Sequence, residues 1–189
     1  MKWITGHLNR IWELSFSRET YLNSKDYQEA EAWFHQFQPQ DDTKYVDALK
    51  YAESKFKACT ETYDLIDKKA EWAIGSATAV IGALLAFYEK FTMGFVLVAI
   101  PIALLLVSIF LALKARIPEL VATPSDVKDV VKFNEDGNSN ALTAASLHCE
   151  VKGKEWSINR KADRLSYAIY LFYVAIISLC VIKLIASLF

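Results

Sequence analysis

The residues with the clearest chemical potential are basic side chains interleaved with a tryptophan near the last third of the chain. Ammonium and guanidinium groups bind phosphate, and a tryptophan ring stacks on a nucleobase. The pattern indicates either a site for a phosphate-bearing ligand, which several subunits would make more positive, or the ordinary attraction of such a segment to anionic lipid. The candidate residues are Arg116, Lys152, Lys154, Trp156, Arg160, Lys161 and Arg164.

Catalytic and metal-binding motifs are not found in the sequence. It has no nucleophile elbow, no Walker loop and no paired carboxylates on a shared helix face. The histidines lie far apart, and His148 and its neighbour Cys149 point in different directions on a helix. The three cysteines are odd in number and widely spaced, which does not suit a disulfide framework. We therefore predict a protein that is not an enzyme and has no metal or cofactor.

Three long apolar stretches decide the fold class. They are Trp72–Tyr88, Phe91–Leu113 and Leu165–Phe189, and the pair Glu89 and Lys90 separates the first two. A helix needs roughly 20 residues to cross a hydrocarbon core of about 30 Å. The chain has 189 residues and is 53% hydrophobic, and two such stretches in succession would need a far larger core around them, which disfavours a soluble fold. We predict an all-α integral membrane protein with three transmembrane helices and an N-terminal cytoplasmic helical region.

The distribution of basic residues predicts the orientation. Lys90 is alone in the turn between the first two spans, whereas Lys68, Lys69 and Lys114 and the candidate basic residues above flank the other ends. Cytoplasmic flanks carry the excess of lysine and arginine. The N-terminus should therefore be cytoplasmic and the C-terminus external. The first 16 residues lack an uninterrupted apolar segment, so they do not resemble a signal peptide.

Four segments follow from these boundaries. Residues 1–70 form a cytoplasmic helical region whose long helix runs into the membrane, residues 71–114 a transmembrane hairpin, residues 115–164 a cytoplasmic loop and helix, and residues 165–189 the third transmembrane helix. Apolar residues at helical spacing in 1–16, Leu8 and Trp12 among them, indicate a helix that lies on the inner leaflet or packs on its neighbours. A second helix is predicted over Arg18–Phe37, before Pro39.

A heptad seam leads from the cytoplasmic region to the first span. Its residues recur in steps of four and three, with no proline or glycine before the membrane, so one continuous helix is expected. The seam could pack inside the chain, or it could form a subunit contact or a lever that carries cytoplasmic events into the membrane. Its residues are Tyr45, Leu49, Ala52, Phe56, Cys59, Tyr63 and Ile66, followed by Ala70.

Small residues line one side of the first span, and small side chains let membrane helices approach closely. This pattern indicates one of two roles: the small residues pack the first span against the second in the hairpin, or they line the axis of an oligomer. In the second span, Pro101 frees backbone groups and favours a kink, and Ser108 follows one to two turns later. The candidate pore or packing residues are Gly75, Ser76, Ala79, Gly82, Ala83, Ala86, Pro101 and Ser108.

The region from Ala48 to the C-terminus resembles a group of bacterial membrane effectors. The likeness rests on "DKKAEWAIGSATAVIGALLAF", on "LALKARIPE" and on "SLHCEVKGKEWSINRKADRLSYAIYLF". These segments are similar to the membrane part of Pycsar-type anti-phage effectors and of related two-transmembrane effectors in nucleotide-signalling systems. The matching residues are Asp67, Lys69, Ala70, Lys114, Arg116, Pro118, Lys161 and Ala168. Many relatives carry a separate ligand-binding domain, which this sequence lacks, so it also resembles the small channel effectors of the Hailong type.

The resemblance implies an inner-membrane ion channel or pore that acts in abortive infection. Its implied partners are the lipid bilayer, further copies of the chain in a homo-oligomer, with a tetramer favoured, and a nucleotide or oligonucleotide made by a partner nucleotidyltransferase. In the Hailong type, the N-terminal extension Met1–Gln38 would be the regulatory element. The alternative from another class is a non-conducting membrane anchor that recruits a soluble partner through the heptad seam.

Overall fold

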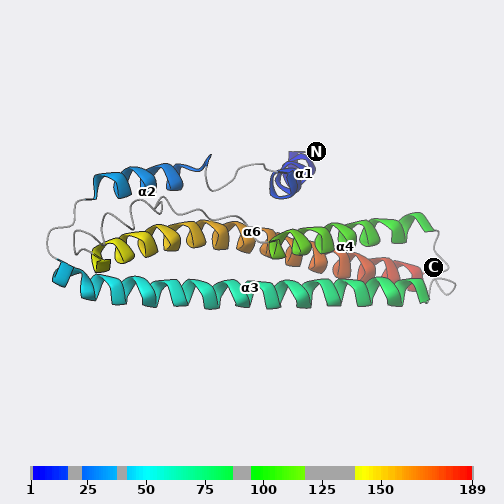
Figure 1. The fold of residues 1–189 in the computed structure, drawn as a ribbon. Coiled ribbons are helices and arrows are strands. Elements are labelled where there is room, and N and C mark those ends of the chain that lie inside the picture. The colour runs from blue at the N-terminus through cyan, green and yellow to red at the C-terminus, as the bar shows by residue number, and fades with distance from the viewer. Residues whose placement is uncertain (1, 17–22, 38–41, 87–94, 118–138, 189) are drawn as a thin grey trace. The chain divides into compact units, whose positions relative to one another are not determined.

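The protein is helical in every element that its computed structural model describes, which confirms the all-α prediction (Figure 1). The described residues are 2–16, 23–37, 42–86, 95–117 and 139–188. The predicted turn at Glu89 and Lys90 and the predicted loop over 118–138 lie outside them. The elements are α1 (Lys2–Phe16), α2 (Lys25–Gln36), the short 3₁₀ helix η2 (Asp42–Tyr45), α3 (Val46–Ala86), α4 (Phe95–Arg116) and α6 (Ser139–Leu188).

Two of these helices are long and apolar enough to cross a membrane, by length and composition: α4 over Val98–Arg116, and α6. Only 39% and 17% of their most apolar windows are buried within the chain. A core helix of a soluble protein would be mostly buried, so these exposed apolar faces are compatible with a lipid surrounding. The predicted first span, Trp72–Tyr88, falls at the end of α3 and extends past the described residues. The described part of α3 has a lower mean hydropathy than the candidate spans in α4 and α6.

The chain divides into two compact units, which are described separately. Unit 1 comprises Met1–Ser17, Leu65–Ile117 and Arg160–Phe189, and unit 2 comprises Arg18–Asp64 and Pro118–Asn159. The boundaries therefore fall within α3 and within α6, earlier than the predicted membrane boundaries at 71 and 165. Helix α1 belongs to unit 1, with the two candidate spans, and not to unit 2, which contains α2.

Small and branched apolar residues hold the spans of unit 1 together. Ala77 of α3, Leu105 of α4 and Ala175 of α6 form a buried cluster, and Figure 1 shows these three segments running alongside one another. The buried Ser108 hydroxyl donates a hydrogen bond of 2.7 Å to the carbonyl of Ala168. Such a bond between helices contributes about 1 kcal/mol in a membrane protein.

Helix α1 packs on α6 within unit 1. His7 is hydrogen-bonded to the hydroxyl of Tyr167, and its ring stacks on Tyr170 with centroids 5.6 Å apart. Arg10 pairs with Asp163 at 3.2 Å. Packing of the apolar face of this segment on a neighbour was one of its two predicted roles, but these contacts come from His7 and Arg10, which are not among the residues of that face. The other, contact with lipid, stays a prediction for its outer face, where Leu8 is 59% and Trp12 67% exposed.

Helix α2 closes the core of unit 2. Ala30 and Phe34 pack against Leu142, Ala145 and Cys149 of α6. The predicted end of this helix is confirmed, but its predicted start at Arg18 is wrong. The helix begins at Lys25 because Ser24 is its N-cap, with an extended backbone and a side chain that accepts a 3.2 Å hydrogen bond from the amide of Tyr27.

Asp42 caps the start of α6 from the neighbouring 3₁₀ helix. One carboxylate oxygen accepts a 3.0 Å hydrogen bond from the amide of Ala141, and the other accepts a 2.7 Å bond from the side chain of Asn140. Replacing Asp42 with alanine should lower the free energy of unfolding by about 1 kcal/mol and speed amide exchange at Ala141, because a capping oxygen is lost. Exchange measured by NMR or mass spectrometry on the full chain checks this. Unchanged exchange at Ala141 would contradict it, and Asp47→Ala on the exposed start of α3 is the control.

Candidate functional site

The residues of the predicted basic site are divided between the two units. In unit 2, Lys154 donates a 2.9 Å hydrogen bond to the hydroxyl of Thr60 and lies 3.5 Å from the centroid of the Phe56 ring. Lys152 is half exposed and lies 3.9 Å from Glu155. Trp156 is half-buried. Lys154 therefore joins α6 to α3, whereas Lys152 keeps an ammonium group at the surface.

The basic residues of unit 1 also bind other parts of the chain. Arg116 pairs with Glu71 at 2.8 Å, and the fully buried Lys161 pairs with Asp67 at 3.1 Å. Arg164 is buried and donates to two backbone carbonyls, that of Leu14 at 3.1 Å and that of Lys114 at 3.4 Å, so it ties α6 to α1 and α4. Arg160 is half-buried. A phosphate-binding role for this group stays a prediction, and most of its positive charge already has a partner in the fold.

The heptad seam lies on the least exposed face of α3. Ala52, Cys59, Ile66 and Ala70 are buried, and the other seam residues, Tyr45, Leu49, Phe56 and Tyr63, are half-buried. This burial inside a single chain favours the intramolecular alternative over a subunit contact. The predicted continuity of the helix is confirmed, because α3 runs without a break from Val46 to Ala86.

The small residues of the first span point away from the core of unit 1. Gly75, Ala79, Gly82, Ala83 and Ala86 are exposed and Ser76 is half-buried, whereas Ala73 and Ala77, on the opposite face, are buried. A Cβ atom added at Gly75 or Gly82 would meet nothing within 4 Å. Among the described residues, this face therefore does not pack on another helix of the chain, and packing against α4 does not explain it.

Pro101 and Ser108 of α4 both lie inside unit 1. Each side chain is fully buried, and the Ser108 hydroxyl is already bonded to α6. In the single chain these two residues therefore contribute to packing between helices. Their role in lining a pore stays a prediction that would require α4 to turn.

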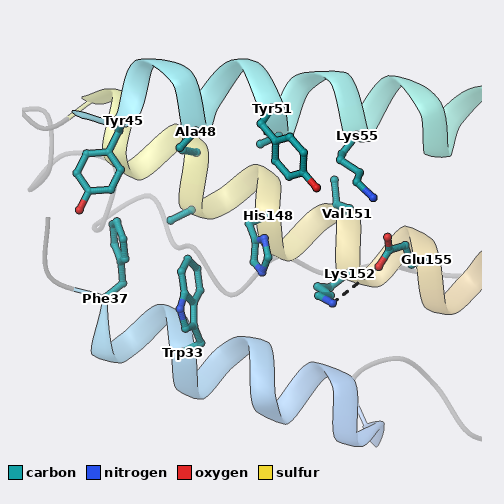
Figure 2. Close-up of a pocket in the computed structure, with 13 residues that line it drawn as sticks. Trp33, Phe37, Tyr45, Ala48, Tyr51, Lys55, His148, Val151, Lys152 and Glu155 are labelled. Atoms are coloured by element: carbon teal, nitrogen blue, oxygen red, sulfur yellow. Dashed lines mark ion pairs between the residues drawn. The ribbon is translucent and has the colours of Figure 1, made fainter. Parts of the chain in front are cut away.

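Unit 2 contains a pocket that the sequence analysis did not predict (Figure 2). It is a half-open pocket of about 300 Å³ among α2, the start of α3 and the start of α6. A continuous series of rings forms one wall: Trp33 lies 5.0 Å from His148 and 5.3 Å from Phe37, and Phe37 lies 5.6 Å from Tyr45, centroid to centroid. The small residues Ala48, Ala52, Ala144 and Ala145 also line the pocket.

Charged groups gather at one end of this pocket. Figure 2 shows Lys55, Lys152 and Glu155 there, with Tyr45 and Phe37 at the opposite end. Burial, followed by the nearby charge of Lys152, lowers the pKa of His148 below its ordinary value, so its ring is neutral at pH 7. Burial raises the pKa of Cys149 on the adjacent core face to about 11, so this thiol is protonated and unreactive.

Two signals in the sequence could have indicated this pocket. Trp33 and Phe37 are four residues apart, which places both rings on one face of the predicted helix, and His148 lies on the helix that enters the third span. What the sequence could not show is that these two helices lie side by side.

Comparison of the chain with known protein families, with curated protein sequences and with solved structures gives no match. Its function is therefore argued from its own residues.

Proposed function

We propose that the protein is an oligomeric ion channel or pore of the bacterial inner membrane, with three spans, a cytoplasmic N-terminus and a periplasmic C-terminus. In this proposal it acts as an anti-phage effector, and a nucleotide-derived signal from a partner nucleotidyltransferase controls its opening. The bilayer and other copies of the chain are its remaining partners. The last part of α3 is the additional span.

A membrane boundary in unit 1 is supported by aromatic residues at one level. Trp72 of α3 is 56% exposed, and its ring contacts Phe172 of α6. The next residue, Tyr173, is also largely exposed. Tryptophan and tyrosine concentrate at membrane–water interfaces because each ring has an apolar body and a polar group. Large apolar side chains such as Leu184 are exposed further along α6.

The observation that carries the oligomer is the outward small-residue face of α3. Membrane helices associate through small residues, since hydrophobicity gives no drive between helices in lipid. This face is exposed, and added Cβ atoms at its glycines would meet no neighbour. A second copy of α3 could approach closely there, with the hydroxyls of Ser76 and Thr78 next to the contact.

The second candidate is a non-conducting anchor, and a specific observation favours it. The exposed side chains of α4 from residue 98 and of α6 from residue 173 are almost all apolar, and Ser108 is used inside the core. A pore wall usually presents polar groups or a hydrophobic constriction that opens. An anchor would need neither an oligomer nor an open state.

Ion flux through liposomes that contain only the purified chain tests the proposal. We expect flux above that of protein-free liposomes, measured by an internal dye, either immediately or after nucleotide extract from phage-infected cells is added. Immediate flux would mean that the cell must hold the channel shut. Flux only with extract would mean an activated effector. Absence of flux under both conditions would contradict the channel proposal and favour the anchor.

A further inference from the structure

We propose that the pocket among α2, α3 and α6 in unit 2 binds a small planar aromatic anion, with one ring system and one carboxylate or phosphate group. The ring system would lie against Trp33 and Phe37, and the anionic group would lie between the ammonium groups of Lys55 and Lys152. Binding itself does not depend on the channel proposal. Its use as the gating signal does rest on that proposed function.

The shape of the pocket selects a flat apolar body. Trp33, Phe37 and Tyr45 give it a continuous aromatic wall, with centroid separations of 5.3 and 5.6 Å. The alanines that line it have no side chain beyond Cβ, so they leave space for a ring without filling it. Stacking of a ring on such side chains is favourable for any π-face. A volume of about 300 Å³ is at the small end for ligand pockets, so it admits one ring system with one substituent.

The charges select an anion. Lys55 and Lys152 bring two ammonium groups and Glu155 one carboxylate, while His148 is neutral at pH 7. The pair between Lys152 and Glu155 is long, at 3.9 Å, and Lys55 lies 6.0 Å from the centroid of the Tyr51 ring. Both ammonium groups therefore keep hydrogen-bond donors for an incoming carboxylate or phosphate. A ligand with one anionic group would neutralise the remaining positive charge.

Both α3 and α6 line the pocket and continue without a break into unit 1. A ligand that changes how these helices pack near residues 52 and 145 therefore acts on the same two helices that carry the proposed spans. This continuity supplies a physical route for regulation. The pocket lining includes Tyr45 and Ala52, so the seam and the pocket share these two residues.

Calorimetry with the full chain in lipid nanodiscs tests the proposal. The probes are adenosine 5′-monophosphate and indole-3-acetate, which carry a ring and an anion from two different sources, together with adenosine, inorganic phosphate and decanoate. We expect at least one of the first two to bind, and we expect each of the last three to bind at least about tenfold more weakly. Binding of adenosine 5′-monophosphate would indicate a nucleotide ligand, and binding of indole-3-acetate would indicate an aromatic carboxylate.

Two variants connect binding to the named residues. Trp33→Leu keeps apolar bulk but removes the ring, and Lys152→Gln keeps length but removes the charge; each should weaken binding of the preferred probe by about tenfold. The matched controls are Trp72→Leu in unit 1 and Lys50→Gln, an exposed lysine of α3 outside the pocket. Circular dichroism of each variant confirms that its helices are retained.

Several results would overturn the proposal. Binding by neither aromatic anion would do so, as would equal affinity for adenosine, for phosphate alone or for decanoate, because the ring or the charge would then be irrelevant. Controls that weaken binding as much as Trp33→Leu and Lys152→Gln would place the site elsewhere. Aromatic-anion binding without any effect on flux would leave the site standing and contradict only its role in gating.

Discussion

Replacing Asp67 with asparagine is expected to destabilise the protein by about 3 kcal/mol, and replacing Lys161 with methionine by much less. The two side chains form an ion pair of 3.1 Å within unit 1, and their environments differ: Lys161 is 0% exposed and Asp67 33% exposed. Removing one partner of a buried pair leaves the other charge without compensation, at a cost of about 3–5 kcal/mol. Asp67→Asn removes the carboxylate that neutralises a fully buried ammonium, whereas Lys161→Met leaves a carboxylate that still reaches water.

The measurement is the free energy of unfolding in mild detergent titrated with a denaturing one, for both single variants and for the double variant. The double variant should be close to Lys161→Met, because the buried charge is gone in both. Lys50→Met is the matched control, since its pair with Asp47 is exposed and 3.9 Å long and should contribute less than about 1 kcal/mol. Equal losses for Asp67→Asn and Lys161→Met would contradict the asymmetry argued from burial.

Local patterns in the sequence predicted the long helices well. The heptad seam and the absence of proline and glycine before Gly75 indicated one helix into the first span, and α3 is that helix. The same pattern predicted which face is buried, since Ala52, Cys59, Ile66 and Ala70 are the seam residues with the least exposure. Periodicity determines such a face because side chains three and four residues apart share it.

The partners of the basic residues could not be predicted from the sequence, because they depend on long-range packing. Asp67 and Lys161 are 94 positions apart, and Arg164 bonds a carbonyl 150 positions away. The number of basic residues in a segment suggests a ligand site even where several of those residues already form ion pairs or hydrogen bonds with other helices of the chain. The pocket was missed for the same reason, since Trp33 and His148 meet only once α2 lies beside α6.

Replacing Ala79 with leucine should abolish the proposed oligomer and lower the proposed ion flux by at least about tenfold. Ala79 lies on the exposed small-residue face of α3, where a larger side chain holds two helix backbones apart. The same change is expected from Gly82→Leu, because Gly82 lies on the same exposed face of α3. A Cβ atom at Gly82 meets nothing within 4 Å in the single chain, so the effect would come from the contact between copies. Neither substitution should disturb the core that Ala77 forms with Leu105 and Ala175.

Cross-linking and light scattering in detergent measure the subunit number, and the liposome assay measures flux on the same samples. Ala103→Leu is the matched control, because Ala103 is an exposed alanine of α4, away from the α3 face, and receives the same added bulk. If Ala79→Leu leaves the oligomer and its flux unchanged, the α3 face is not the contact. If Ala103→Leu is as damaging as Ala79→Leu, any added bulk disturbs the assembly and the argument for this face fails. Loss confined to Ala79→Leu and Gly82→Leu would separate a packed channel from an anchor, since an anchor has no contact between copies of α3 to lose.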